Sequence, residues 1–331
     1  MVALLVNLII FIISIIAMSK FSHITIKSSI ALSKITRLGE LAIGFVLLSL
    51  ITSVPELILS IMAIFYGEVG ISIGNILGSN VANIALILGI VSIIYPLKVT
   101  ERSLRKILNI LSVSVLILLL LLILRTVKTV IGILLVITFL VFSLYVTKRR
   151  VTIEKLRTRA KTPIEEIIIS FRFYKHLFLI CFGIVGMIIA SHFTIKSAAS
   201  IAIKLNIHEI VIGAIMVAFG TSLPEFFTTL KAVKEKHVNL ALGNIVGSCL
   251  TNLTLVLGMT LIFAPLQVDM ETFYTLIIFT LTGTFLLEFF LGNLGRNKLD
   301  RLEGIILLFL YIAFIATIYG MEIGLLRFLQ F

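Results

Sequence analysis

The sequence predicts an all-α polytopic membrane protein with about ten transmembrane helices, arranged as two inverted five-helix repeats. The 331 residues are 60% hydrophobic and 13% charged, with a mean hydropathy of +1.20, whereas soluble domains average roughly 45–50% apolar residues. Apolar runs of about 20 residues, the length that spans a bilayer as a helix, occur ten times along the chain. A polar pentapeptide in the second run recurs in the seventh, which indicates the repeat.

The first repeat, which we assign to residues 1–147, contains five of the predicted spans. They are expected at residues 2–18, 40–66, 70–94, 107–124 and 129–147. The first run has no Lys or Arg before its apolar core, so it lacks the charged start of a secretory signal peptide. We therefore expect residues 2–18 to be a membrane span.

A basic segment, residues 148–172, separates the two repeats. We expect a solvated cytoplasmic linker there, with a short interfacial helix at residues 164–170 as the alternative. The second repeat, residues 173–331, has an odd number of spans like the first, so it must enter the membrane with the opposite polarity, as in many secondary transporters. Its spans are expected at residues 173–192, 209–230, 238–263, 272–292 and 303–320.

The positive charges concentrate in alternate loops, which orients the spans. With the N-terminus outside, the loops assigned to the cytoplasm hold 23 of the 28 Lys and Arg residues, and the outer loops and tail hold 5. Because Lys and Arg accumulate in cytoplasmic loops, we expect a cell-membrane protein with both termini outside. The net charge of +12 then sets the topology in the lipid bilayer, and we expect no nucleic-acid partner.

Residues 52–56, with the sequence TSVPE, interrupt the second span with polar and proline residues. The sequence TSLPE at residues 221–225 repeats them 169 positions later. Inverted repeats place such related segments near each other at the membrane midplane, so we expect the two pentapeptides to form one site. The same offset, without an insertion or deletion, also relates Gly74 to Gly243, Asn75 to Asn244, Gly78 to Gly247, Ser79 to Ser248, Asn83 to Asn252 and Gly89 to Gly258.

The polar side chains of this motif share one helix face. Glu56 follows Thr52 by four residues and Ser53 by three, a spacing that puts all three on one side of a helix. Pro55 lacks a backbone N–H and frees a carbonyl of the preceding turn. The next span adds a stripe of Asn75, Ser79 and Asn83, and the second copy repeats the set with Thr221, Ser222, Glu225, Asn244, Ser248 and Asn252.

These side chains offer two carboxylates with hydroxyl and amide oxygens, and no imidazole or thiolate. Hard cations such as Ca²⁺ take oxygen ligands, whereas softer metals select His or Cys. Two carboxylates balance one divalent cation, so the set favours Ca²⁺. The alternative is a pair of protonated, hydrogen-bonded glutamates, which the matched positions disfavour. Cys181 and Cys249 show no CxxC spacing, so neither a disulfide framework nor a thiolate metal site is supported.

At these residues the chain resembles the cation/calcium exchanger superfamily, specifically prokaryotic relatives of sodium/calcium exchangers. The matching stretches are residues 43–89, which contain TSVPE and GNILGSNVANIALILG, and residues 212–258, which contain GTSLPE and GNIVGSCLTNLTLVLG. The resemblance implies a secondary active antiporter that exchanges Ca²⁺ for Na⁺, or in some branches for H⁺, by alternating access. It also implies that the first and sixth spans slide against the other eight.

The resemblance further implies that Glu56 and Glu225 are the central cation ligands. Surrounding side-chain or carbonyl oxygens would come from Thr52, Ser53, Ser79, Thr221, Ser222 and Ser248, and Asn83 and Asn252 occupy the paired Asn/Asp positions of the family. The Ca²⁺ and monovalent cations are substrates, so no cofactor and no obligatory protein partner is expected.

The chain departs from the family pattern at three positions. Ile51 stands where the second copy has Gly220, and Cys249 stands where Asn is expected, as at Asn80 in the first copy. Many sodium/calcium exchangers carry Asp at the position of Asn252. The site therefore has two formal negative charges instead of three.

Other functions are compatible with parts of this pattern. A Ca²⁺/H⁺ antiporter would use the same two glutamates, and a passive cation channel is disfavoured by the inverted repeats. Enzyme activity is not expected, because Asp269 and Asp300 lie in loops and no Ser/His or HExxH arrangement lies within a span.

Overall fold

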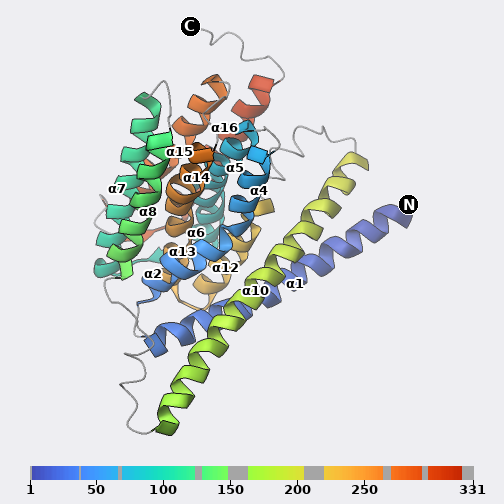
Figure 1. Ribbon diagram of the computed structural model, residues 1–331. Helices are drawn as coiled ribbons and strands as arrows, with labels where there is room; N and C mark the ends of the chain where they lie inside the picture. The colour runs from blue at the N-terminus through green and yellow to red at the C-terminus, as the bar shows by residue number, and fades with distance from the viewer. Residues whose placement is uncertain are drawn as a thin grey trace.

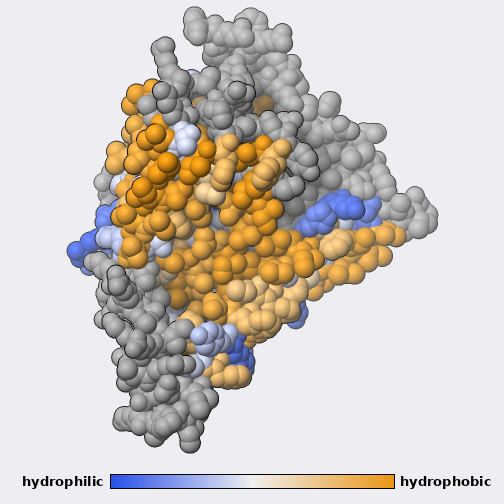
Figure 2. Space-filling model, viewed as in Figure 1, coloured by the Kyte–Doolittle hydropathy of each residue, from blue (hydrophilic) through white to orange (hydrophobic). Residues whose placement is uncertain are grey.

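The computed structural model is an almost entirely helical bundle (Figure 1). It describes residues 2–36, 39–65, 69–123, 129–147, 163–204, 220–263, 270–292 and 297–322. Within these ranges, nine helices are long and apolar enough to cross a membrane. Hydrophobic residues dominate the described face shown in Figure 2, as expected for helices whose outer surface contacts lipid. The polytopic all-α prediction is confirmed.

The first repeat follows the predicted order of spans. The second predicted span is built from α2 to α4, the third from α5 to α6, and the fourth begins earlier than predicted, at Glu101. The elements are α1 (Val2–Thr36), α2 (Glu40–Ala42), η1 (Ile43–Leu48), α3 (Ser49–Thr52), α4 (Val54–Phe65), α5 (Val69–Val81), η2 (Ala82–Leu88), α6 (Gly89–Ile94), α7 (Glu101–Ile123) and α8 (Thr129–Thr147), where η marks a π-helical segment.

The second repeat has the corresponding elements. Residues 209–219 of the predicted seventh span lie outside the described residues, and α12 contains the rest of that span. The elements are α10 (Pro163–Lys204), α12 (Leu223–Lys234), α13 (Val238–Thr251), η3 (Asn252–Val256), α14 (Leu257–Phe263), α15 (Met270–Gly292) and α16 (Arg301–Glu322). Two short antiparallel strands, β1 (Leu97–Lys98) and β2 (Lys298–Leu299), pair residue 97 with residue 299 and so join the two repeats.

The first helix is longer than predicted. The sequence places the end of the first span at residue 18, but α1 continues without a break to Thr36. The prediction failed because Lys20, Lys27 and Lys34 end the apolar run, although all three are exposed on a helix whose other side remains buried. That buried side carries mostly hydroxyl side chains, so the mean hydropathy falls although the helix continues; its buried residues are Ser22, Thr25, Ile26, Ser28, Ser29, Leu32 and Thr36.

The sixth helix is also longer than the predicted span of residues 173–192. α10 begins at Pro163, a residue favoured in the first turn of a helix, and ends at Lys204. Residues 164–170 are therefore the first turns of this helix, and the helix occupies the end of the expected linker. α1 and α10 lie side by side along one flank of the bundle (Figure 1).

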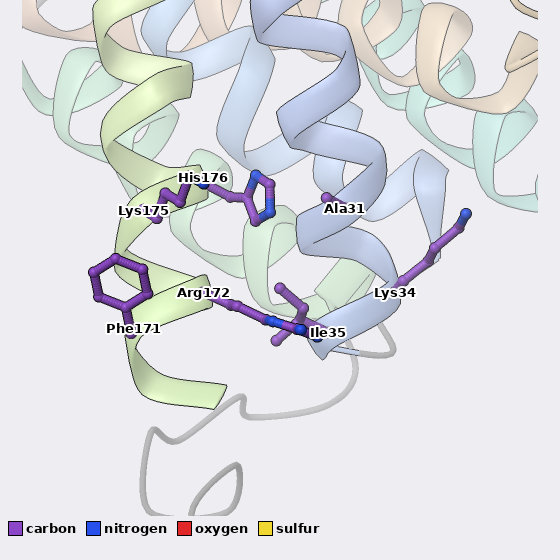
Figure 3. Close-up of a pocket in the computed structure, with 7 residues that line it drawn as sticks. All are labelled: Ala31, Lys34, Ile35, Phe171, Arg172, Lys175 and His176. Atoms are coloured by element: carbon purple, nitrogen blue, oxygen red, sulfur yellow. The ribbon is translucent and has the colours of Figure 1, made fainter. Parts of the chain in front are cut away.

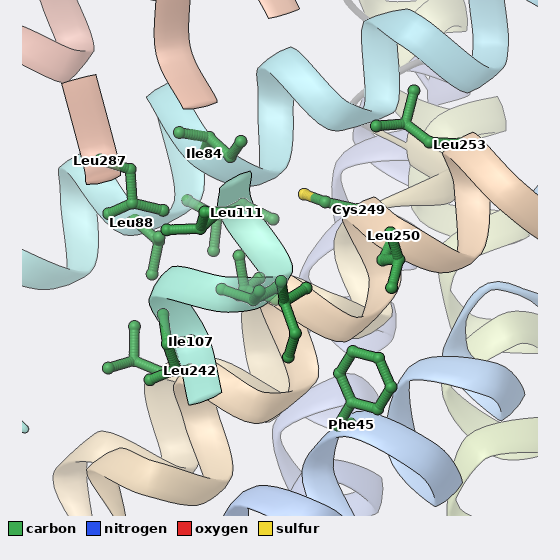
Figure 4. Close-up of a cluster of buried hydrophobic side chains, with 14 of the residues drawn as sticks. Phe45, Ile84, Leu88, Ile107, Leu111, Leu242, Cys249, Leu250, Leu253 and Leu287 are labelled. Atoms are coloured by element: carbon green, nitrogen blue, oxygen red, sulfur yellow. The ribbon is translucent and has the colours of Figure 1, made fainter. Parts of the chain in front are cut away.

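The hydrophobic core lies where elements of both repeats meet. Figure 4 shows Phe45 of η1 and Leu88 of η2 in the same cluster as Ile107 of α7, Leu250 of α13 and Leu287 of α15. All five are almost fully buried. Burying such side chains inside the bundle provides close packing between helices, which is the main source of helix association in a membrane.

Glycines allow the second and eighth spans to cross so closely that their backbones are in contact. A Cβ added to Gly243 would lie 2.6 Å from the carbonyl oxygen of Leu41, and one added to Gly247 would lie 2.8 Å from the Cβ of Ser49. These distances are too short for any side chain. The spacing of glycines in the eighth span therefore serves close helix packing, as the GxxxG pattern predicts.

Gly243→Ala is expected to destabilise the protein, whereas Gly74→Ala, at the repeat-related position, is the matched control. A Cβ on Gly74 meets nothing within 4 Å, so alanine there should gain about 0.5–1 kcal/mol of helix propensity. Overpacking at Gly243 should cost about 1–3 kcal/mol. Thermal unfolding of both purified variants in detergent measures the difference. Equal losses at the two positions would contradict the close crossing.

Candidate cation site

Both pentapeptides break their helix at the same serine. Ser53 follows α3 with φ −82° and ψ 6°, and Ser222 precedes α12 with φ −86° and ψ 3°, whereas an α-helix has ψ near about −42°. Pro55 and Pro224 then occupy the first turn of the following helix, where a missing N–H leaves no helical bond unmade. The predicted proline-associated breaks are confirmed, and they share one geometry.

The hydroxyl of Thr52 contacts the second repeat. It lies 3.4 Å from the Oγ of Ser248 and 3.4 Å from the Oδ1 of Asn244, both on α13. Thr52 is fully buried, so these contacts are made inside the protein.

The hydroxyl of Thr221 makes the corresponding contacts with the first repeat. It lies 3.5 Å from the Oγ of Ser79 and 3.4 Å from the Oδ1 of Asn75, both on α5. Adding 169 to the residue numbers 52, 75 and 79 gives 221, 244 and 248. The two sets of contacts are therefore related by a local two-fold arrangement, and each repeat completes the polar cluster of the other.

The two glutamates lie inside this cluster. Glu56 and Glu225 are each 1% exposed. The hydroxyl of Ser248 donates to the Oε1 of Glu225 at 3.3 Å. Both carboxylate oxygens of Glu56 and the Oε2 of Glu225 have no hydrogen-bond partner. Buried carboxylates without partners are costly unless a cation or protons neutralise them, so the arrangement is suited to holding a cation.

The other predicted site residues, Ser53, Ser222, Asn83 and Asn252, are also buried. The hydroxyls of Ser53 and Ser222, both amide atoms of Asn83 and the Oδ1 of Asn252 have no hydrogen-bond partner. All four residues are at most 1% exposed. Unpartnered buried oxygens are rare in proteins, and a bound ion is one reason for their presence.

Within the described residues, no group of three or more His, Cys, Asp or Glu side chains is placed to hold a metal ion. The two carboxylates must therefore be supplemented by hydroxyl, amide or carbonyl oxygens. Such a donor set fits a hard cation better than a transition metal.

π-helical segments follow the polar stripes in both repeats. η2 contains Asn83, and η3 begins at Asn252. π-helical turns are rare in proteins, and those that occur often lie at functional sites. A third segment, η1, precedes TSVPE, and its repeat-related residues 212–217 lie outside the described part of the chain. Sequence reasoning missed these segments because a π-helical turn is defined by its backbone hydrogen bonds, which the hydropathy of the residues does not report.

One departure from exact symmetry, Asn80 against Cys249, lies at a contact between the two repeats. The side-chain amide of Asn80 donates to the backbone carbonyl of Cys249 at 3.1 Å, and its Oδ1 accepts from the Nδ2 of Asn252 at 3.2 Å. Asn80 and Cys249 are themselves repeat-related. Cys249 has no side-chain amide, so it cannot make the equivalent pair of amide hydrogen bonds with the first repeat.

Two further residues were missed by sequence reasoning. Ser60 and Thr229 follow Glu56 and Glu225 by one helical turn, and they are again 169 positions apart. Both are at most 1% exposed, and neither hydroxyl has a hydrogen-bond partner. Extending the repeat offset by four residues along the same helix face would have found them.

Comparisons with known proteins find relatives that match most of this chain. A model of the family described as sodium/calcium exchanger protein matches residues 6–148 and 175–320. The sodium/calcium exchanger MaX1 of Methanosarcina acetivorans is 29% identical over 348 residues, which cover 95% of this chain and 99% of that protein. The putative antiporter CaxA of Alkalimonas amylolytica is 26% identical over 284 residues, covering 84% and 87%.

Solved structures give the same result. The sodium-calcium exchanger NCX_Mj, soaked with zero Na⁺ and Ca²⁺, superposes with a TM-score of 0.80 at 26% identity, and the match covers 95% of this chain and 99% of that one. The family match extends through both repeats and includes both TSxPE motifs. This chain belongs to the sodium/calcium exchanger family, a family of membrane transporters and not of enzymes.

Proposed function

We propose that this protein is a secondary active antiporter that exchanges Ca²⁺ for Na⁺ across the membrane by alternating access, with Glu56 and Glu225 as the central cation ligands. The observation that carries the proposal is the pair of buried carboxylates, three of whose four oxygens have no hydrogen-bond partner. Two such charges need compensation in a membrane interior. One Ca²⁺ supplies the two compensating positive charges. The relatives MaX1 and NCX_Mj are named sodium/calcium exchangers, which supports Ca²⁺ and Na⁺ as the exchanged ions.

The proposed ligand shell draws on both repeats. Ca²⁺ takes six to eight oxygens, more than two carboxylates provide. We assign the remaining oxygens to the hydroxyl or carbonyl groups of Thr52, Ser53, Ser79, Thr221, Ser222 and Ser248 and to the amide oxygens of Asn83 and Asn252. Seven of these eight residues are buried and Thr221 is partly buried, and the hydroxyl of Ser248 donates to Glu225, which supports the assignment.

A Ca²⁺/H⁺ antiporter is the second candidate, and one observation favours it. Residues 83 and 252 are both Asn, so the two glutamates are the acidic groups of the proposed shell. Two protons would neutralise such a pair as completely as one Ca²⁺. Na⁺ remains the favoured counter-ion because the relatives named above are sodium/calcium exchangers.

Ca²⁺ uptake into proteoliposomes separates these candidates. We expect vesicles loaded with Na⁺ and diluted into Na⁺-free buffer to accumulate radioactive Ca²⁺, whereas vesicles loaded with N-methylglucamine should not. A pH gradient, inside acidic and without Na⁺, should give no accumulation. Uptake driven by the pH gradient alone would establish H⁺ exchange instead. Ca²⁺ conductance without countertransport would indicate a channel, and no uptake under either gradient would exclude both antiporters.

The charge distribution also supports a proposed orientation in the cell membrane. With 23 of the 28 Lys and Arg residues on one side, the positive-inside rule places both termini outside and residues 148–172 in the cytoplasm.

A further inference from the structure

A pocket lies between the end of α1 and the start of α10, at the end of the bundle where α10 begins. It has a volume of about 610 Å³. Its lining comes from these two helices alone and includes no residue of the proposed cation site. The lining residues, shown in Figure 3, are Ala31, Lys34, Ile35, Phe171, Arg172, Lys175 and His176.

The pocket carries positive charge without carboxylate partners. Lys34, Arg172 and Lys175 all line it, and no described acidic residue does. None of these three makes an ion pair within the described ranges, whereas Lys231 pairs with Glu235 at 3.2 Å. Unpaired cations around one pocket create a local field that attracts anions. The guanidinium of Arg172 in particular offers the forked donors that match a phosphate group.

The imidazole of His176 adds a further polar group to the pocket. Its Nδ1 is buried and has no hydrogen-bond partner. Figure 3 shows His176 and Arg172 extending from α10 towards α1. A buried nitrogen without a partner is costly, and an oxygen-rich ligand in the pocket would supply the missing bond.

An apolar stripe begins at the pocket and follows the outer face of α10. Phe171, Tyr174, Phe178 and Phe182 are each at least 50% exposed. Their spacing of three and four residues puts them on one side of the helix. A water-soluble anion gains no binding energy from such an apolar surface, whereas an acyl chain can pack along it.

We propose that this pocket binds the phosphate of an anionic membrane phospholipid, with the acyl chains lying along the aromatic stripe of α10. Basic pockets between helices on the cytoplasmic side of membrane proteins bind lipid headgroups in this way. The headgroup contacts Lys34 on α1 and Arg172, Lys175 and His176 on α10, and therefore links the ends of the two longest helices. The site is independent of the proposed Ca²⁺ transport.

Delipidated full-length protein in phosphatidylcholine nanodiscs, with and without phosphatidylglycerol, tests the proposal. We expect phosphatidylglycerol to raise the melting temperature by about 5 °C, because a ligand that binds only the folded state stabilises it. Native mass spectrometry should show retained phosphatidylglycerol in preference to phosphatidylcholine. The double variant Arg172→Gln/Lys175→Gln should weaken retention at least tenfold and remove the temperature shift.

The matched control is Lys20→Gln/Lys27→Gln, which removes two exposed charges from α1 outside the pocket. It should retain the lipid like the unmodified protein. Equal retention of the two lipids, or undiminished binding by the pocket variant, would overturn the proposal. A shift of the same size with inorganic phosphate alone would assign the pocket to a soluble anion and exclude the lipid. Should the double variant not fold, Arg172→Gln alone replaces it in the same comparison.

Discussion

Glu56→Gln and Glu225→Gln are each expected to abolish Ca²⁺ uptake into proteoliposomes, with residual rates at least a hundredfold below the unmodified protein. The substitution preserves side-chain size but removes one of two buried charges. A hundredfold loss corresponds to about 2.7 kcal/mol, which is small for the removal of a charge paired with a divalent cation inside a membrane. Uptake under an outward Na⁺ gradient is the measurement.

Glu235→Gln is the matched control for both variants. This carboxylate lies in the turn after α12, is partly exposed and pairs with Lys231 at 3.2 Å. Exposed ion pairs contribute little, so uptake should be nearly unchanged. All three variants should elute as folded protein in size-exclusion chromatography. Retained uptake in either central variant would remove that carboxylate from the mechanism.

Thr52→Val and Thr221→Val are expected to raise the Ca²⁺ concentration for half-maximal uptake by about tenfold each. Each hydroxyl contacts a serine and an asparagine of the opposite repeat at 3.4 to 3.5 Å. A valine keeps the volume but leaves those buried groups without this contact, which costs about 1–3 kcal/mol. Because the two sets of contacts are repeat-related, the two shifts should be similar.

Thr284→Val controls for the loss of any buried hydroxyl. Thr284 is 1% exposed and donates only along its own helix, to the carbonyl of Thr280 at 2.7 Å. Uptake by this variant should keep the original Ca²⁺ dependence. A large shift in one threonine variant and none in the other would contradict the equivalence of the two copies.

The repeat explains why so much of the fold and the candidate site could be predicted from the sequence. A fixed offset of 169 residues identified both helix breaks and the polar stripes, and the structure brings Thr52 to Ser248 and Thr221 to Ser79. Apolar length located most of the spans because a bilayer demands it. These signals arise from residue type and spacing, which the sequence contains directly.

The features that could not be predicted depend on backbone geometry and on neighbouring helices. The extension of α1 to Thr36 could not be predicted without knowing that α10 packs against it. In the sequence, the lysines after residue 18 indicated a loop. The π-helical segments η2 and η3 differ from α-helix only in backbone pairing. The hydrogen bond between Asn80 and Asn252 lies where the two repeats differ. The sequence showed this difference only as a cysteine, Cys249, at the position related to Asn80.

The crossed contacts of the central cluster have a consequence for how the protein is made. The contacts of Thr52 and Thr221 join residues between 142 and 196 positions apart. Contacts of such long sequence separation form late in folding. When the ribosome has completed the first repeat, Glu56 is already in the membrane but Glu225 and Ser248 do not yet exist. The cluster is therefore assembled only after the eighth span has been inserted.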